Sequence, residues 1–302
     1  MGTIFEIIIR RAKETTNTKA GQFYTPRDIV RTLVSLVLCG KEDDIQVPGR
    51  HFSIYDPCCG TGGILTVAKK HIEEEARKAG RTDVRVILNG QELNEKTYAI
   101  CKSDMLLTGE LQSGKIEVGD TLADDKFSGK VFNYMLANPP FGVDWKKIEG
   151  TIKTESENPN GRFSAGLPAT SDGSLLFLQH MISKMDPDGG SRIGIVLNGS
   201  PLFNGDAGSG WSNIRKSILD HDLLDAIVAI PKSLFYSTGI ATYLWILDNK
   251  KPASHKGKVL FVNAECQEAF TELLQKNLGQ KRFSITEAAT AKIVEIYRNY
   301  TD

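Results

Sequence analysis

The chain has 302 residues, of which 40% are hydrophobic and 25% are charged. This composition is typical of a globular protein with one large core or two modest ones, and it excludes a fibre or a disordered chain. Lysine plus arginine number 37, as do aspartate plus glutamate, so the formal net charge is zero and no global field draws the chain to DNA.

The five cysteines have no CxxC spacing and the histidines do not cluster with them, so we expect neither a metal site nor a disulfide framework. This cysteine usage favours a reducing, cytoplasmic setting. No apolar run reaches the roughly 18 residues that a membrane-spanning helix needs, and the N-terminus lacks a secretory apolar region, so no membrane contact is expected.

Short apolar, β-branched segments alternate with amphipathic helical segments along most of the chain. This alternation predicts an α/β fold with a doubly wound, mostly parallel sheet covered by helices. In such sheets, ligands bind where loops leave the carboxyl ends of the strands. The seven expected strands are 52–56, 84–91, 116–118, 131–137, 193–197, 224–230 and 242–247, and amphipathic helices are expected at 64–79 and 175–185.

Three regions are expected along the chain. Residues 1–50 form a helical N-terminal flank, residues 51–265 form the main domain, and residues 266–302 form a polar, helical C-terminal flank. The last region stops without an obvious closing element, so we expect the chain to be a truncated part of a longer protein.

Residues 143–172 interrupt the alternation, with few large apolar side chains and many small or polar ones. A loop of this length is usually functional or disordered, and we expect it to be mobile. It carries Trp145, three lysines and Arg162. Two interpretations stay open: the loop closes over a substrate or touches a phosphate backbone, or it is a solvated insertion.

The segment DPCCGTGG, residues 56–63, follows the first strong strand and opens a helix. Its glycines allow a tight turn and close approach of a ligand to the backbone. The spacing is not GxGxxG and no Walker lysine is present, so neither a dinucleotide fingerprint nor a P-loop is indicated. Asp56 at the strand end favours a cationic ligand group. The alternative is a glycine-rich turn without a ligand.

Two further acidic residues end the next strands. Glu92 lies where α/β nucleoside-binding folds place a carboxylate that accepts from the ribose hydroxyls. Asp120, within Gly-Asp-Thr-Leu at 119–122, is placed to accept an N–H of an adenine ring. A solvated glutamate and a turn aspartate are the plain alternatives. The order of glycine loop, ribose acid and base-contacting acid is what a doubly wound nucleotide site needs.

Residues 131–142, VFNYMLANPPFG, run from an apolar strand into an Asn-Pro-Pro-Phe corner. The two prolines remove backbone donors and stiffen the chain, which leaves nearby carbonyls free to accept from a ligand. Asn138 adds a side-chain carbonyl and Phe141 a flat ring, so the corner suits an exocyclic amine on a planar base or an amide. A rigid strand-to-loop corner is the alternative.

These motifs, in this order, resemble those of S-adenosylmethionine-dependent DNA adenine-N6 methyltransferases. The rest of the chain looks like the modification (M) subunit of type I restriction-modification systems. GQFYTPR at 21–27 resembles the family's upstream cofactor motif, residues 56–63 its glycine loop and residues 138–141 its catalytic motif. The resemblance covers about residues 4–265 and includes segments 172–174, 189–190 and 234–240.

The resemblance implies a class I, Rossmann-like fold and a division of labour among the site residues. Asn138 and the Pro139 carbonyl would accept from the target amine, Phe141 would stack on a flipped adenine, and the amine would attack the methyl group in line without a metal or a nucleophilic side chain. The implied catalytic residues are Asn138, Pro139, Pro140 and Phe141. The implied cofactor residues are Gln22, Phe23, Tyr24, Thr25, Pro26, Arg27, Asp56, Pro57, Gly60, Thr61, Gly62, Gly63, Glu92, Asp120 and Thr121.

The implied partners are double-stranded DNA with a flipped adenine and the DNA specificity (S) subunit. A second M subunit and a restriction (R) subunit are further partners that the family allows. The chain departs from the family in its short helical flanks, which puts binding of the S subunit in doubt, and in Cys58, where a small residue such as alanine is common.

Three alternatives to adenine methylation stay open: methylation of a protein glutamine, methylation of cytosine at N4, and an inactive scaffold that keeps the fold. The first follows from the amide-binding chemistry of the Asn-Pro-Pro-aromatic corner. The DNA target is not encoded in this chain, because another subunit would recognise the sequence.

Overall fold

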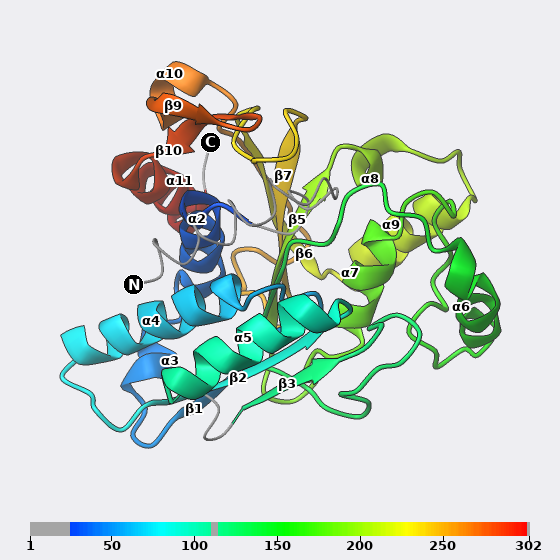
Figure 1. Ribbon diagram of the computed structural model, residues 1–302, viewed down its shortest axis with the longest axis horizontal. Helices are drawn as coiled ribbons and strands as arrows, with labels where there is room; N and C mark the ends of the chain where they lie inside the picture. Colours follow the sequence, from blue (N-terminus) through cyan, green and yellow to red (C-terminus); the bar gives the residue numbers. More distant parts are fainter. Residues whose placement is uncertain (1–24, 110–113, 301–302) are drawn as a thin grey trace.

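The computed structural model describes residues 25–109 and 114–300, and its centre is an eight-stranded sheet with the order β3-β2-β1-β4-β5-β7-β6-β8 (Figure 1). Only β7 runs against its neighbours β5 and β6. The predicted mostly parallel, doubly wound sheet is confirmed, with β8 as an additional strand. The sheet consists of β1 His51–Asp56, β2 Arg85–Glu92, β3 Lys115–Val118, β4 Tyr134–Ala137, β5 Arg192–Asn198, β6 Leu224–Ile230, β7 Thr242–Asp248 and β8 Leu260–Asn263.

Helices cover both faces of the sheet (Figure 1). Apolar residues of α2, α4, α5 and α11 share one hydrophobic core with the sheet, and those of α7 and α9 share a second core with its other face. The helices are α2 Arg27–Leu38, α3 Glu42–Gln46, α4 Gly63–Lys78, α5 Glu95–Leu107, α7 Ser174–Ile182, α8 Ser200–Phe203, α9 Gly210–Asp220, α10 Gln267–Phe270 and α11 Glu287–Asn299. Within the described ranges, no helix is long and apolar enough to cross a membrane.

The two cores follow from the period-two alternation of side chains along a strand. In β7, Leu244 and Ile246 belong to one core while Trp245 and Leu247 belong to the other. Gly194 in β5 permits close approach of α2, because an added Cβ would lie 2.5 Å from a methyl group of Val37. This packing holds the second half of α2 close against the sheet.

The strand that leads into the Asn-Pro-Pro-Phe corner is shorter than predicted. Strand β4 begins at Tyr134, whereas 131–137 was expected. The three preceding residues form a connection in which Phe132 makes an isolated bridge to Met185. The strand still ends at Ala137, so the corner leaves the sheet where it was predicted to.

The prediction of a helical C-terminal flank is wrong for residues 271–285. Two antiparallel strands, β9 Thr271–Leu278 and β10 Lys281–Ile285, lie between α10 and α11. The turn between them uses Gly279 at φ +64°, a conformation that suits glycine. Polar β9, with the sequence TELLQKNL, lacks the alternation that marks a strand, so tertiary pairing decides its structure.

Both flanks pack on the same body as the sheet. Thr32 of α2 and Thr290 of α11 share a hydrogen bond of 2.9 Å between their hydroxyls, and Arg31 donates to Glu287 at 2.7 Å. Apolar residues of α2 and α11 lie in one core cluster. Helices α2 and α3 fit the expected helical N-terminal flank over its described part.

The structure contradicts the expectation that residues 143–172 form a long irregular loop. The segment contains a 3-10 helix, η3 Lys146–Ile148, and helix α6 Glu149–Ser156. Trp145, Ile152 and Phe163 are buried and pack with two leucines from outside the segment. This small core removes the basis for expecting mobility, because it ties the segment to the main body.

Candidate active site

The candidate site lies at the carboxyl ends of the central strands, where β1 and β4 are neighbours and the strand order reverses. A ligand crevice is expected at such a switch point. A recess of about 790 Å³, including its space open to solvent, occupies this position. Its lining is Thr25, Asp56, Pro57, Cys58, Cys59, Gly60, Thr61, Gly63, Ile64, Glu92, Leu93, Asp120, Thr121, Asn138, Pro140 and Phe177.

The recess brings together most of the sequence-predicted residues, including all three acids and the glycine loop. Of the described part of the upstream motif, residues 25–27, Thr25 contributes to the lining, whereas the predicted Pro26 and Arg27 do not. Gln22, Phe23 and Tyr24 lie outside the described residues. Leu93 and Phe177 were not predicted, and single apolar side chains give no sequence signal that separates them from ordinary packing.

The glycine loop turns from β1 directly into α4. Gly60 and Gly62 have φ angles of +56° and +81°, so both use the left-handed conformation that favours glycine. A Cβ on Gly62 would also lie 2.8 Å from the sulfur of Cys101. Gly62 is the N-cap of α4, and no described side chain caps this end, which leaves backbone N–H groups of the first turn for a ligand.

Asp56 is buried at the end of β1, and one of its carboxylate oxygens accepts from the backbone N–H of Cys58 at 3.0 Å. Burial, with a smaller contribution from the nearby charge of Glu92, raises the pKa of Asp56 to about 7, against the lowering effect of the Cys58 hydrogen bonds. A cationic ligand group would favour the ionised carboxylate. The site therefore suits a positively charged group beside Asp56.

Glu92 is buried and ties two loops together. One carboxylate oxygen accepts from the N–H of Gly60 at 2.9 Å and the other from the N–H of Asn94 at 2.8 Å. A carboxylate oxygen has more than one lone pair, so Glu92 can also accept from a hydroxyl group of a ligand in the recess. Glu92 thus shapes the glycine loop while it lines the pocket.

The third acidic position follows β3 and is held through the backbone. A carboxylate oxygen of Asp120 accepts from the N–H groups of Leu122 and Ala123 at 3.0 and 3.4 Å. The Thr121 hydroxyl donates to the carbonyl of Pro57 at 2.5 Å, so this loop is joined to the glycine loop. Asp120 and Glu92 line the same recess.

Asn138 is the residue where two recesses meet. Its side-chain nitrogen donates to the Thr25 hydroxyl at 2.9 Å. Its side-chain oxygen is buried and has no hydrogen-bond partner among the described residues. A buried acceptor without a partner costs about 1 to 3 kcal/mol, so its retention calls for an explanation.

The second recess lies on the other side of the corner and has aromatic walls. The rings of Phe141 and Phe235 meet edge to face, with centroids 6.1 Å apart. Asn198 and Phe235 were not predicted as site residues, although segment 234–240 had been noted for its resemblance and Asn198 ends a strand. The lining of this recess is Asn138, Pro139, Phe141, Gly142, Asn198, Phe235, Ser237, Thr238 and Ile240.

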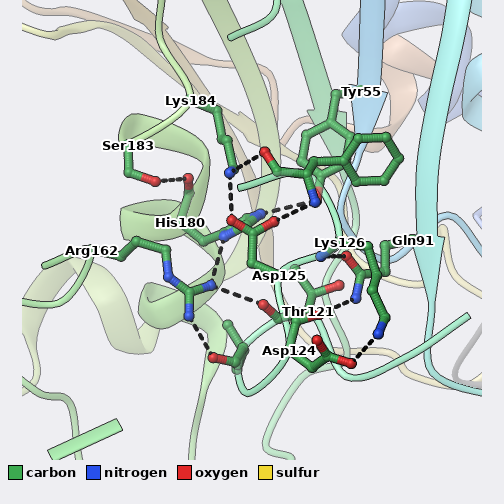
Figure 2. A network of polar contacts seen from close by, with 12 residues as sticks. Tyr55, Gln91, Thr121, Asp124, Asp125, Lys126, Arg162, His180, Ser183 and Lys184 are labelled. Atoms are coloured by element: carbon green, nitrogen blue, oxygen red, sulfur yellow. Dashed lines mark hydrogen bonds and ion pairs between the residues drawn. The ribbon is translucent and has the colours of Figure 1, made fainter. Parts of the chain in front are cut away.

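Arg162 does not face solvent, where a phosphate could reach it. Its guanidinium forms an ion pair of 2.6 Å with Glu155. It also contacts His180 and the backbone after Asp120 (Figure 2). Of the predicted basic residues of segment 143–172, this one is therefore part of the interior beside the first recess.

Together, the fold and the two recesses define a member of the N-6 DNA Methylase family, whose model matches residues 1–302, so the chain belongs to this family. A curated relative, the type I restriction enzyme MjaIX methylase subunit of Methanocaldococcus jannaschii, is 30% identical over 300 residues, which cover 99% of this chain and 49% of the relative. The chain thus spans about half the length of the curated relatives it matches.

Solved structures agree with this assignment. The type I restriction-modification system methyltransferase subunit from Streptococcus thermophilus superimposes with a TM-score of 0.73 and 26% identity, over 93% of this chain and 54% of that one. A solved structure from Listeria monocytogenes, named as a class I S-adenosylmethionine-dependent methyltransferase, shares the fold with a TM-score of 0.66 and 18% identity, over 98% of this chain and 77% of that one. The predicted class I fold is confirmed.

Proposed function

We propose that this chain is the catalytic part of a type I modification subunit and transfers a methyl group from S-adenosylmethionine to the N6 amine of adenine in DNA. The observation that carries the proposal is the unpaired side-chain oxygen of Asn138, buried at the wall shared by two recesses. An acceptor in this position can bind an amine that enters from one recess and orient it toward the other.

The first recess fits S-adenosylmethionine, whose sulfonium supplies an electrophilic methyl group when the cofactor is bound. The uncapped start of α4 suits its carboxylate, and buried Asp56 suits its positive charge. Glu92 would accept from the ribose hydroxyls, and Asp120 from an adenine N–H. We assign residues 22–27 to the methionine end, where Thr25 lines the recess.

The second recess fits a flipped adenine. The oxygen of Asn138 would accept one N6 hydrogen and the Pro139 carbonyl the other, which directs the nitrogen lone pair toward the first recess. Phe141 and Phe235 offer aromatic surface for the base. These residues hold the amine in line and exclude water, and orientation of reactants can lower a barrier by about 7 to 11 kcal/mol. The surplus proton leaves the nitrogen after transfer.

The zero net charge of the chain favours a partner that supplies most of the DNA binding. A net charge of zero supplies little attraction to phosphates, so we propose that a DNA specificity subunit provides both sequence recognition and much of the binding. A second modification subunit and a restriction subunit would complete the assembly. Because the proposed substrate is DNA, we also propose a cytoplasmic location.

The test is N6-methyladenine in DNA, measured by mass spectrometry. The DNA comes from a host without adenine methylation that expresses the full-length protein with its operon neighbours. We expect a signal with the native protein, no signal with Asn138→Ala, and an unchanged signal with Asn160→Ala, whose side chain is exposed. Full methylation by Asn138→Ala would overturn the assigned mechanism. Methyl label in protein instead of DNA would support the glutamine alternative.

A further inference from the structure

The guanidinium of Arg162 uses every hydrogen-bond donor that it has. An arginine side chain carries five N–H donors in a rigid fork. Two of them go to the Glu155 carboxylate at 2.7 and 2.6 Å, and one goes to Nδ1 of His180 at 3.0 Å. The remaining two go to the backbone carbonyls of Thr121 and Leu122 at 2.9 and 2.8 Å.

The two carbonyls belong to the residues that follow Asp120. The Asp120 carboxylate accepts from the N–H of Leu122, so a shift of this backbone moves the carboxylate with it. The Thr121 side chain is joined to Pro57 of the glycine loop. Arg162 therefore acts on the cofactor recess through the backbone, without lining it.

Other elements hold the same loop farther along the chain. The side chain of Gln91 donates to the carbonyl of Asp124 at 2.8 Å, and Lys184 donates to the carboxylate of Asp125 at 2.5 Å (Figure 2). Both contacts lie three or more residues beyond Thr121. Within residues 25–109 and 114–300, Arg162 is the side chain that donates to the carbonyls of Thr121 and Leu122, which directly follow Asp120.

Two neighbouring side chains fix the orientation of the Arg162 guanidinium. The Glu155 carboxylate holds one edge of the guanidinium, and His180 holds one of its nitrogens. Because arginine only donates, Nδ1 of His180 is unprotonated. Nε2, which lies 3.0 Å from the Tyr55 hydroxyl oxygen, therefore carries the hydrogen and donates it to that oxygen. Lysine cannot reproduce this arrangement, since its ammonium offers three donors from a single atom.

We propose that Arg162 is a positioning residue that sets Asp120 for recognition of the exocyclic amine of the cofactor's adenine. This inference rests on the proposed function, because it takes S-adenosylmethionine as the ligand of the first recess. It gives segment 143–172 a role in cofactor selection, in place of the DNA contact or solvated insertion that its composition favoured.

The experiment compares the binding of S-adenosylhomocysteine with that of its deaminated S-inosyl counterpart by calorimetry on the full chain. In the inosine ring a carbonyl replaces the amine, so a well-placed Asp120 carboxylate should reject it. We expect the native protein to prefer the adenosyl ligand by at least tenfold. Arg162→Lys should reduce this preference to less than threefold, as should Asp120→Asn, whereas Arg77→Lys at an exposed position of α4 should keep it.

The ratio of the two affinities separates positioning from general stability. If Arg162→Lys weakens both ligands equally, or changes neither, the proposal is overturned. If Arg162→Lys does not fold, Glu155→Gln takes its place, because it loosens the fork and leaves the arginine present; an unchanged ratio in that variant is then decisive. Failure of the native protein to bind S-adenosylhomocysteine would overturn the proposed function itself.

Discussion

Asn138 and Thr25, 113 positions apart in the chain, are joined by a hydrogen bond of 2.9 Å from the amide nitrogen to the hydroxyl oxygen. Because the nitrogen is engaged, the amide oxygen must point elsewhere, and it is this oxygen that lies buried without a partner among the described residues. Thr25 precedes α2, so the packing of α2 on the sheet controls the orientation of the proposed catalytic amide.

Replacing the Thr25 hydroxyl should therefore lower the rate of transfer. We expect Thr25→Val to reduce kcat by about tenfold, the effect of losing one hydrogen bond of about 1.4 kcal/mol in the transition state. Thr25→Ser keeps the hydroxyl and should retain most of the activity. The measurement is transfer of labelled methyl to DNA by the assembled complex. Equal activity of the valine and serine variants would show that the hydroxyl does not orient Asn138.

Cofactor binding should depend on pH through Asp56. Its pKa is raised to about 7 in the free protein, mainly by burial, and the ionised form is the one that attracts a cationic ligand. Binding of S-adenosylmethionine should thus tighten as the pH rises, by about tenfold between pH 6 and pH 8. Calorimetry at several pH values measures this. Asp56→Asn should bind more weakly and lose the pH dependence, and a pH-independent native protein would contradict the prediction.

The same carboxyl should make the folded protein less stable as the pH rises. The folded-state pKa of about 7 lies above the ordinary value of 3.8, so the folded protein binds more protons than the unfolded chain between these values. Below about pH 4 the carboxyl is protonated in both states, so it does not change the free energy of unfolding. Between about pH 4 and pH 7 the free energy of unfolding falls progressively, by about 4 kcal/mol at most.

Asp56→Asn should accordingly unfold at a higher denaturant concentration than the native protein at pH 8, with a smaller difference at pH 4. The amide oxygen of asparagine can still accept from the N–H of Cys58, so the turn is preserved. Urea denaturation at the two pH values checks this. A less stable Asp56→Asn at pH 8 would contradict the assigned protonation behaviour.

The sequence is sufficient to predict where the main polar residues of the site lie, because the carboxyl ends of parallel strands meet at a common edge of the sheet. Asp56, Glu92, Asp120 and Asn138 each follow a short apolar run, and their order is enough to predict that they meet. The contacts that orient these side chains could not be predicted from the sequence. Glu155 and Arg162 lie in a stretch without apolar periodicity, and only tertiary packing brings them beside His180.

The hairpin of β9 and β10 was missed for a similar reason. Its strand β9 is polar and mostly exposed, so neither alternation nor a continuous apolar run marks it. Its partner strand is anchored by Lys281, whose burial cannot be inferred from a lysine in sequence. A buried acid on α2 holds the hairpin against the main body, because it accepts hydrogen bonds from Lys281 and from the N–H of Ile285.

This acid is Asp28, and the ion pair with Lys281 gives the last prediction. The lysine nitrogen lies 3.0 and 2.8 Å from the two carboxylate oxygens and 3.1 Å from the carbonyl of Leu234, and both side chains are less than 10% exposed. Burial lowers the pKa of Lys281, while Asp28 opposes this effect. Phe235 of the second recess follows Leu234 directly, so the pair supports that wall.

Removing one partner should be costlier than removing both. Lys281→Met leaves the Asp28 carboxylate buried without its cation, and we expect a loss of about 3 to 5 kcal/mol in the free energy of unfolding. The double variant with Asp28→Asn should recover part of this loss, because no uncompensated charge remains. Arg282→Met, at the exposed neighbouring position, should change stability by less than about 0.5 kcal/mol. Urea denaturation of the native protein, Lys281→Met, Asp28→Asn and the double variant measures the cycle. Simple addition of the two single losses in the double variant would rule out the coupling.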